Sequence, residues 1–190
     1  MIVSLRGTHG SGKSHIVRQI LQRYNAQPER TDKKGRPVNY VMQLANGSSL
    51  YVVGCYVNAC GGCDSIQPYS EIWPRIERFA DLGHVLFEGA LVSSSYGNIG
   101  RATERYGDEC VFAFLDTPLE VCLARIQARR TARGDMRPIN PKNTQGKFEG
   151  IMKSLPKIRD EFRRRILILD YRKAVPQLLR LFYEDRRVAK

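Results

Sequence analysis

The chain has 190 residues, of which 42% are hydrophobic, and this is enough for one domain with a buried core. No apolar run approaches the roughly 18 residues of a transmembrane helix, and the opening "MIVSL" leaves no room for a signal peptide. We therefore expect a soluble, cytoplasmic protein with no membrane partner. The five cysteines are an odd number, and in a reducing compartment we expect no disulfides.

The formal net charge of +12 is distributed unevenly along the chain. Residues 1–120 carry 12 basic and 12 acidic side chains, whereas residues 121–190 carry 19 basic and 7 acidic ones, so the whole excess lies in the last 70 residues. Such a segment is either a solubilising surface or a surface for a phosphate-rich partner, and the charge leaves both interpretations open.

The first part of the chain alternates strand-like and helical patterns. "MIVSL" predicts a strand, and the residues after the glycine-rich stretch that follows it predict a helix to about Tyr24. Segment 28–39 is polar and rich in turn residues, which predicts an exposed loop. The apolar runs 40–44 and 50–56 flank "ANGSS", and an Asn-Gly pair there predicts a hairpin that adds antiparallel strands to the core.

The rest of the chain alternates short apolar runs, typical of buried parallel strands, with helical patterns. The runs cover 84–89, 109–116 and 166–170, and the helical patterns cover 68–83, 147–165 (disturbed at Pro156) and 174–183. Thr117 to Glu120 has the form of a capping box, which predicts a further helix start, and segment 133–146 predicts a mobile connection after that helix. We therefore expect an α/β fold with a mainly parallel sheet flanked by helices.

The segment "GTHGSGKS" matches the P-loop pattern and lies between a predicted strand and a predicted helix. Its glycines let backbone N–H groups turn toward phosphate oxygens, and the helix N-terminus adds a partial positive charge. Lys13 is expected to reach the β- and γ-phosphates and Ser14 to bind Mg²⁺. The pattern assigns an ATP or GTP site to Gly7, Thr8, His9, Gly10, Ser11, Gly12, Lys13 and Ser14.

An arginine-rich segment, "RIQARRTARGDMR", follows the last strand but one. The chain has no Asn-Lys-x-Asp for guanine and no evident Asp-x-x-Gly switch, which argues against a GTPase. The segment resembles the lid that small nucleotide kinases carry at this place over the triphosphate, and we therefore expect one P-loop kinase domain over residues 1–190 with a lid at about 129–147. Arg129 and Arg133 lie four residues apart on one helical face and are the candidates for neutralising charge on the transferred phosphoryl group. The alternative is a solvated basic helix face.

Two carboxylates are candidates near the phosphate acceptor. Glu88 ends the strand "VLFEG", at the sheet edge where ligands bind in such folds. It either holds Mg²⁺ through water or accepts the proton of an acceptor hydroxyl, and a purely structural role at the strand end is the third possibility. Asp64 is the second candidate.

Asp64 follows a cysteine- and glycine-rich loop, "GCYVNACGGCD". Cys60 and Cys63 form a Cys-x₂-Cys pair with Cys55 nearby, but a structural zinc needs four ligands and no fourth one is near in the sequence. The pair Gly61-Gly62 instead favours a close backbone approach to a ligand.

The motifs "GTHGSGKS", "GCYVNACGGCDSI", "VLFEG", "LDTPLEVCLARI" and "NPKNTQGKFEGIMKSL" resemble those of the thymidylate-kinase-like P-loop kinases. Within them the chain resembles a phage-encoded subgroup that phosphorylates 5-hydroxymethyluridine in DNA. Glu88 also resembles the Glu that deoxynucleoside kinases carry at this place, where thymidylate kinases usually have Asp-Arg. The resemblance implies ATP and Mg²⁺ as cofactors and transfer of the γ-phosphate to the hydroxymethyl group of 5-hydroxymethyluracil in DNA, a step in thymidine hypermodification.

Three other functions remain open at this point. A kinase of free nucleosides or nucleoside monophosphates would act without DNA. A non-catalytic, nucleotide-gated DNA-binding module would transfer no phosphate, and a polynucleotide end kinase would label 5′ termini rather than an internal base.

Overall fold

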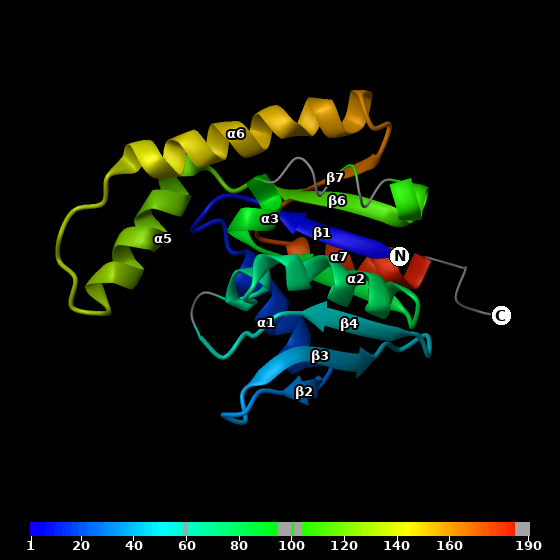
Figure 1. Cartoon of the computed structure of the whole chain (residues 1–190). Coiled ribbons are helices and arrows are strands. Elements are labelled where there is room, and N and C mark those ends of the chain that lie inside the picture. Colours follow the sequence, from blue (N-terminus) through cyan, green and yellow to red (C-terminus); the bar gives the residue numbers. More distant parts are fainter. Residues whose placement is uncertain (59–60, 95–99, 101–103, 185–190) are drawn as a thin grey trace.

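The computed structural model describes residues 1–58, 61–94, 100 and 104–184. A seven-stranded sheet in the order β2-β3-β4-β5-β1-β6-β7 forms its centre (Figure 1). Neighbouring strands from β4 to β7 pair in parallel, and β2, β3 and β4 pair antiparallel. The strands are β1 (Ile2–Arg6), β2 (Gln27–Thr31), β3 (Pro37–Gln43), β4 (Ser49–Val53), β5 (His84–Glu88), β6 (Cys110–Leu115) and β7 (Arg165–Leu169).

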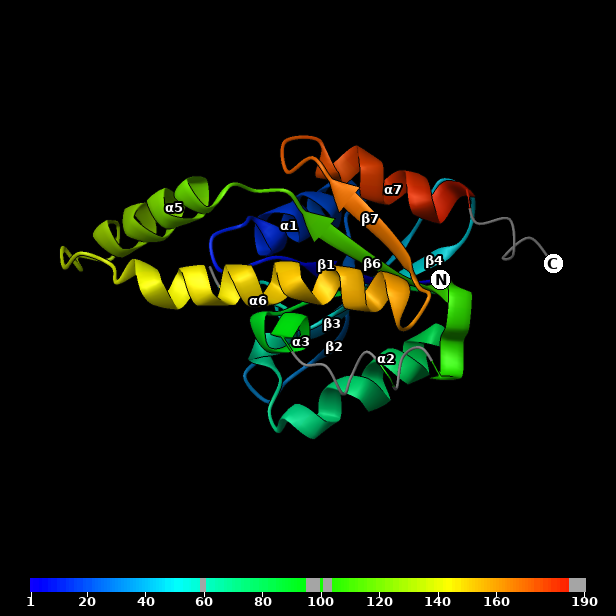
Figure 2. The ribbon, with the colours of Figure 1, turned by 90° about the horizontal axis from the view of Figure 1, so that it is seen from above.

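Helices cover both faces of the sheet, with α1 and α7 on one face and α2, α3 and α6 on the other (Figure 2). The helices are α1 (Lys13–Arg23), α2 (Ile72–Ala80), α3 (Ala90–Ser94), α5 (Leu119–Thr131), α6 (Pro141–Asp160) and α7 (Ala174–Glu184), with short 3₁₀ turns at η1 (Cys63–Ser65), η2 (Tyr69–Glu71) and η3 (Gly107–Glu109). No helix among the described residues is long and apolar enough to span a membrane.

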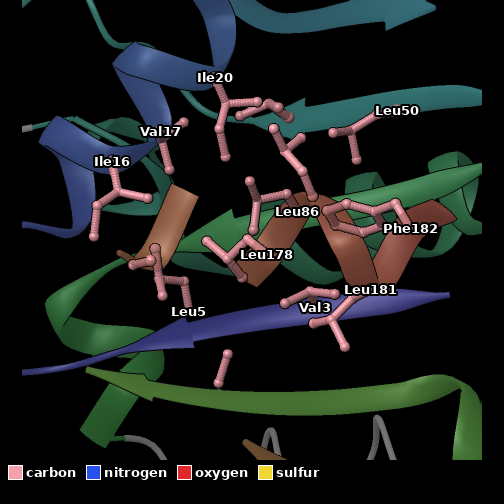
Figure 3. Packing of buried hydrophobic residues seen from close by; sticks show 14 of the residues in the cluster. Val3, Leu5, Ile16, Val17, Ile20, Leu50, Leu86, Leu178, Leu181 and Phe182 are labelled. Atoms are coloured by element: carbon pink, nitrogen blue, oxygen red, sulfur yellow. The ribbon is translucent and has the colours of Figure 1, made fainter. Parts of the chain in front are cut away.

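Alternation along β1 builds both halves of the core. Val3 and Leu5 point to the face covered by α1 and α7, where Ile20 and Phe182 pack around them (Figure 3), and Ile2 points to the opposite face. Each such buried side chain contributes roughly 1.5–3 kcal/mol through the apolar surface it removes from water. The core thereby fixes the strand whose carboxyl end leads into the P-loop.

The predicted hairpin is present as β3 and β4. The prediction of an exposed loop at 28–39 is wrong. Most of it forms β2 and the start of β3, joined by a turn in which Asp32 accepts hydrogen bonds from the backbone N–H groups of Lys34 and Arg36. An edge strand exposed on both sides has no apolar alternation, so a polar sequence there resembles a loop. The run 166–170 likewise forms an edge strand, β7, in which Ile168 is half exposed instead of buried.

Two helix starts also differ from the sequence expectations. Thr117 does not cap α5, because its hydroxyl donates to the carbonyl of Ser11 at 2.8 Å, and the helix begins at Leu119. The next helix, α6, begins at Pro141 rather than at 147, since the side chain of Asn140 caps it by accepting from the N–H of Lys142. Residues 141–146, six of the fourteen in the expected mobile connection, are therefore helical.

Helix α5, residues 132–140 and the first half of α6 project beyond the carboxyl edge of the sheet (Figures 1 and 2). This projection, residues 119–150, is called the arm below. It contains the whole segment expected to form a lid.

Candidate active site

The P-loop connects the buried strand β1 to helix α1. Gly10 and Gly12 have φ angles of 77° and 105°, in the left-handed region that favours glycine. A Cβ on Gly10 would lie 2.3 Å from the carbonyl oxygen of Cys122 in α5, so the loop also packs directly against the base of the arm. The Lys13 ammonium donates to the carbonyls of Gly7 (2.7 Å) and Thr8 (3.2 Å), folded over the loop where phosphates bind in such sites.

A cavity of about 220 Å³ opens in front of the P-loop. Its wall includes residues 9–14, and the structure adds to them Asp64, Glu88 and Arg129, three of the residues singled out from the sequence. Arg133 does not line this cavity.

Glu88 occupies the carboxyl end of β5, directly beside β1, where Leu5 is its register partner. Its Oε1 accepts a hydrogen bond from the Ser14 hydroxyl at 2.8 Å, and the residue is 2% exposed. Burial raises the pKa of this carboxyl above its usual value, while the charge of Lys13 and the Ser14 hydrogen bond lower it by smaller amounts. A carboxylate with this environment binds protons more readily than one in water.

Asp64 lies in the same cavity but is engaged differently. Its Oδ2 accepts from the N–H of Ala90 at 2.8 Å and its Oδ1 from the N–H of Leu91 at 3.2 Å. Both oxygens therefore bind the start of α3, the helix that begins two residues after Glu88. This geometry favours a positioning role for Asp64 over a role as a base.

Of the glycine pair before Asp64, Gly61 lines the P-loop cavity and Gly62 lies against Glu88. Gly62 has a φ of 74°, and a Cβ there would lie 2.4 Å from the backbone oxygen and 2.6 Å from Oε1 of Glu88. The close approach expected at this loop is thus made to the catalytic candidate itself. Cys60 lies outside the described residues, Cys55 and Cys63 are free thiols, and no cluster of metal ligands occurs in the described part of the chain.

Two further arginines line the cavity: Arg125, the first residue of the arginine-rich segment, and Arg18, which the sequence analysis did not single out. Arg18 donates to the carbonyls of Tyr56 (3.0 Å) and Asn58, and Arg125 donates to that of Ser11 at 3.2 Å. Arg18 lies four residues after Ser14 on α1, and this helical spacing is the signal that could have predicted it.

The arm touches the P-loop through α6. The Thr8 hydroxyl donates to the carbonyl of Thr144 at 3.3 Å, and His9 Nε2 lies 2.9 Å from the Lys147 ammonium. Burial, and then the charges of Lys147 and Lys13, lower the pKa of His9. A neutral imidazole that accepts from Lys147 satisfies this geometry.

Mg²⁺ fits the donor set beside the P-loop. Mg²⁺ prefers oxygen ligands and is usually held by one or two protein oxygens together with substrate phosphates. The hydroxyl of Ser14 and the carboxylate of Glu88 are 2.8 Å apart and both line the cavity.

The P-loop lies between a central parallel strand and a helix, and a carboxylate on the neighbouring strand and several arginines face the same cavity. These features define the chain as a P-loop phosphotransferase. Comparison with known proteins identifies the family. The chain is 34% identical over 160 residues to the 5-hmdU DNA kinase of Pseudomonas phage PaMx11, covering 83% of this chain and 84% of that one. It is 33% identical over 138 residues to the 5-hmdU DNA kinase of Pseudomonas phage M6, covering 67% and 71%. The chain belongs to the family of the 5-hmdU DNA kinases.

No family model matches the chain. Among solved structures, a gluconokinase from Sinorhizobium meliloti 1021 superimposes with a TM-score of 0.48 at 16% identity, over 99% of this chain and 97% of that chain.

Proposed function

We propose that this chain transfers the γ-phosphate of ATP to the hydroxymethyl oxygen of 5-hydroxymethyluracil in DNA. The observation that carries the proposal is Glu88, a buried carboxylate facing the P-loop cavity and bonded to the Ser14 hydroxyl. An alcohol acceptor gains from such a group because it must lose a proton, whereas a phosphate acceptor is already ionised. The names of the two phage relatives supply the acceptor.

On the ATP side, the P-loop N–H groups and Lys13 bind the phosphates. Lys13 exchanges its bonds to the Gly7 and Thr8 carbonyls for bonds to the β- and γ-phosphate oxygens. Ser14 is the residue that would hold Mg²⁺, which neutralises phosphate charge when bound, and Glu88 is left to accept the acceptor's proton. Arg129, on the arm side of the cavity, stabilises charge on the transferred group.

The nucleoside part of ATP fits a neighbouring cavity of about 520 Å³. Its wall includes the side chains of Arg125 and Tyr171. The Arg125 guanidinium stacks on the Tyr171 ring, with its central carbon 5.2 Å from the ring centroid. Arg125 and His15 line both this cavity and the P-loop cavity, so one ligand can extend through both.

On the acceptor side, Glu88 takes the proton of the hydroxymethyl group. The freed oxygen forms a bond to the γ-phosphorus as the bond from that phosphorus to the β–γ bridging oxygen breaks, and ADP leaves. Oε1 of Glu88 is held by Ser14, and Oε2 is the atom that receives the proton. The enzyme would act where phage DNA and ATP meet, in the cytoplasm of the infected cell.

The test uses γ-labelled ATP, Mg²⁺ and four acceptors: duplex DNA with 5-hydroxymethyluracil, the same duplex with thymine, the free nucleoside and its monophosphate. The DNA is digested to nucleosides after the reaction. We expect label in a phosphomethyl-deoxyuridine from the first DNA only. Label on the free monophosphate alone would overturn the proposal in favour of a kinase of free nucleosides or nucleoside monophosphates. Label at 5′ termini would indicate a polynucleotide end kinase. DNA binding that depends on ATP, with no label on any acceptor, would indicate a non-catalytic DNA-binding module.

A further inference from the structure

A second cavity lies against the P-loop cavity on the side of the arm. Its volume is about 270 Å³, and its wall consists of His9, Ile126, Arg129, Arg130, Arg133 and Thr144. His9 and Arg129 line both cavities, so the two share a wall. A group in the second cavity lies next to the point where the phosphoryl group is transferred.

The positive charge of this cavity is only weakly compensated, since Asp135 interacts with Arg130 at a distance but forms no ion pair with it. Three arginines of α5 and the residues after it line it, and no carboxylate does. Asp135, the nearest acidic residue in the sequence, pairs with Arg137 at 2.8 Å. Within the described ranges, no carboxylate pairs with Arg129, Arg130 or Arg133. Like charges gathered in this way repel one another, and an anion between them removes that cost.

The opposite wall also favours an anion. Thr144 belongs to the first turns of α6, whose N-terminus is capped by Asn140, and a helix N-terminus carries a partial positive charge. Lys147, one turn further on, bonds to His9 at 2.9 Å and adds a cation beside the shared wall. Both walls therefore select for negative charge.

We propose that this second cavity binds a backbone phosphate of the DNA strand next to the target nucleotide. The inference rests on the proposed function, because it takes the acceptor to be DNA. ATP places its phosphates in the P-loop cavity, and His9 is the only P-loop residue in the wall of the second one. A phosphodiester neighbouring the acceptor base is the anion that reaches this position at the same time. Guanidinium groups suit it because they bind phosphate oxygens in pairs.

The test measures DNA binding and turnover separately. Arg130→Gln, Arg133→Gln and the double variant are compared with Arg165→Gln, which removes the same charge at the opposite end of the sheet, where β7 begins. Fluorescence anisotropy gives the Kd for a labelled 5-hydroxymethyluracil oligonucleotide from low to high salt. Steady-state kinetics gives KM for DNA and KM for ATP, and thermal melting confirms that each variant is folded.

We expect each arginine variant to raise the Kd and the KM for DNA about three- to tenfold, and to reduce the slope of log Kd against log salt by about 1. KM for ATP should stay at the wild-type value, and Arg165→Gln should match wild type throughout. Wild-type DNA binding by the double variant, or a rise in KM for ATP equal to that for DNA, would overturn the inference. If wild type phosphorylates no DNA, the proposed function fails, while the anisotropy data still decide whether this cavity holds DNA.

Discussion

All five residues of β1 are buried, whereas α5 buries only Cys122 and Ile126 among its thirteen residues. The two carboxylates at the carboxyl edge of the sheet are paired within the molecule, since Glu88 accepts from Ser14 and Asp64 accepts from the start of α3. In the arm, by contrast, Arg129, Arg130 and Arg133 form no ion pair with a carboxylate in the described part of the chain. The sheet edge therefore holds its carboxylates in place through contacts of its own, whereas the arm presents positive charge that an anionic ligand would neutralise.

The difference separates two tasks. Phosphoryl transfer needs groups held within a few tenths of an ångström, and a packed sheet edge provides them. Binding a long polyanion needs accessible positive charge, and a segment with few buried contacts opens at low free-energy cost. Substitutions in the sheet should therefore change catalysis or stability. Substitutions in the arm should change DNA binding, and those at Arg125 and Arg129, which also line the P-loop cavity, should change catalysis as well.

The largest effect is expected for Lys13→Ala. Removing the ammonium leaves the β- and γ-phosphate charge without its main protein partner, and we expect kcat/KM to fall about a thousandfold. The labelled-ATP assay measures this. Lys153→Ala, which removes a lysine from the exposed side of α6, is the matched control, and an equal loss there would show that total charge matters rather than the P-loop.

Glu88→Gln should reduce kcat by about 10²- to 10³-fold because the variant accepts no proton. It should also raise the melting temperature at neutral pH. Burial raises the pKa of Glu88 in the folded state, so its ionisation destabilises the fold progressively as pH rises above about 4.5, the usual Glu value, and through the raised pKa. Glutamine removes that cost.

Melting curves at pH 5 and pH 8 test this sign directly. The variant should gain more over wild type at pH 8 than at pH 5, while wild-type activity should fall as pH drops through the raised pKa of Glu88. A variant that is less stable than wild type at pH 8 would contradict the assignment of a costly buried charge.

A smaller loss is expected for Asp64→Ala. Losing the acceptor for the N–H groups of Ala90 and Leu91 loosens the start of α3, and we expect kcat to fall about tenfold. Asp64→Asn keeps one amide oxygen and should recover part of the activity, with the acidic limb of the pH profile unchanged. A loss in Asp64→Asn equal to that of Glu88→Gln would make Asp64 the base.

Arg6→Met should affect stability more than catalysis. The buried guanidinium donates to the carbonyls of Val92 (3.0 Å) and Ser93 (2.5 Å), and burial lowers its pKa to about 10, which keeps it charged at neutral pH. Leaving those carbonyls unpaired should cost about 2–3 kcal/mol, measured by denaturant unfolding. Arg133→Gln in the arm should cost less than about 0.5 kcal/mol, and equal costs would erase the contrast between the two regions.

The parts of this molecule that local patterns define were predicted from the sequence. The P-loop, the central strands and the position of Glu88 depend on spacing and apolar runs within a few residues. The hydrogen bond that Ala90 N–H donates to Asp64 joins residues far apart in the chain, and no local sequence pattern predicts it. The edge strand β2 was missed because solvent on both sides removes the alternation that marks a strand.

The arginines show the same limit. Arg129 and Arg133 lie on one face of a helical pattern, yet only Arg129 lines the P-loop cavity. Helix α5 leads away from the P-loop and ends at Thr131. Arg133, four residues after Arg129, therefore lines only the second cavity and not the P-loop cavity. The direction of the arm relative to the sheet decides their roles, and that direction is a tertiary property.

The division of tasks between sheet and arm is tested most directly by measuring kcat/KM for 5-hydroxymethyl-2′-deoxyuridine, free and within an oligonucleotide, across a range of salt concentrations. We predict that the oligonucleotide is preferred by at least about a hundredfold at low salt, and that the preference narrows as salt rises because the arm acts through charge. Equal kcat/KM for the two acceptors at every salt concentration would contradict the account.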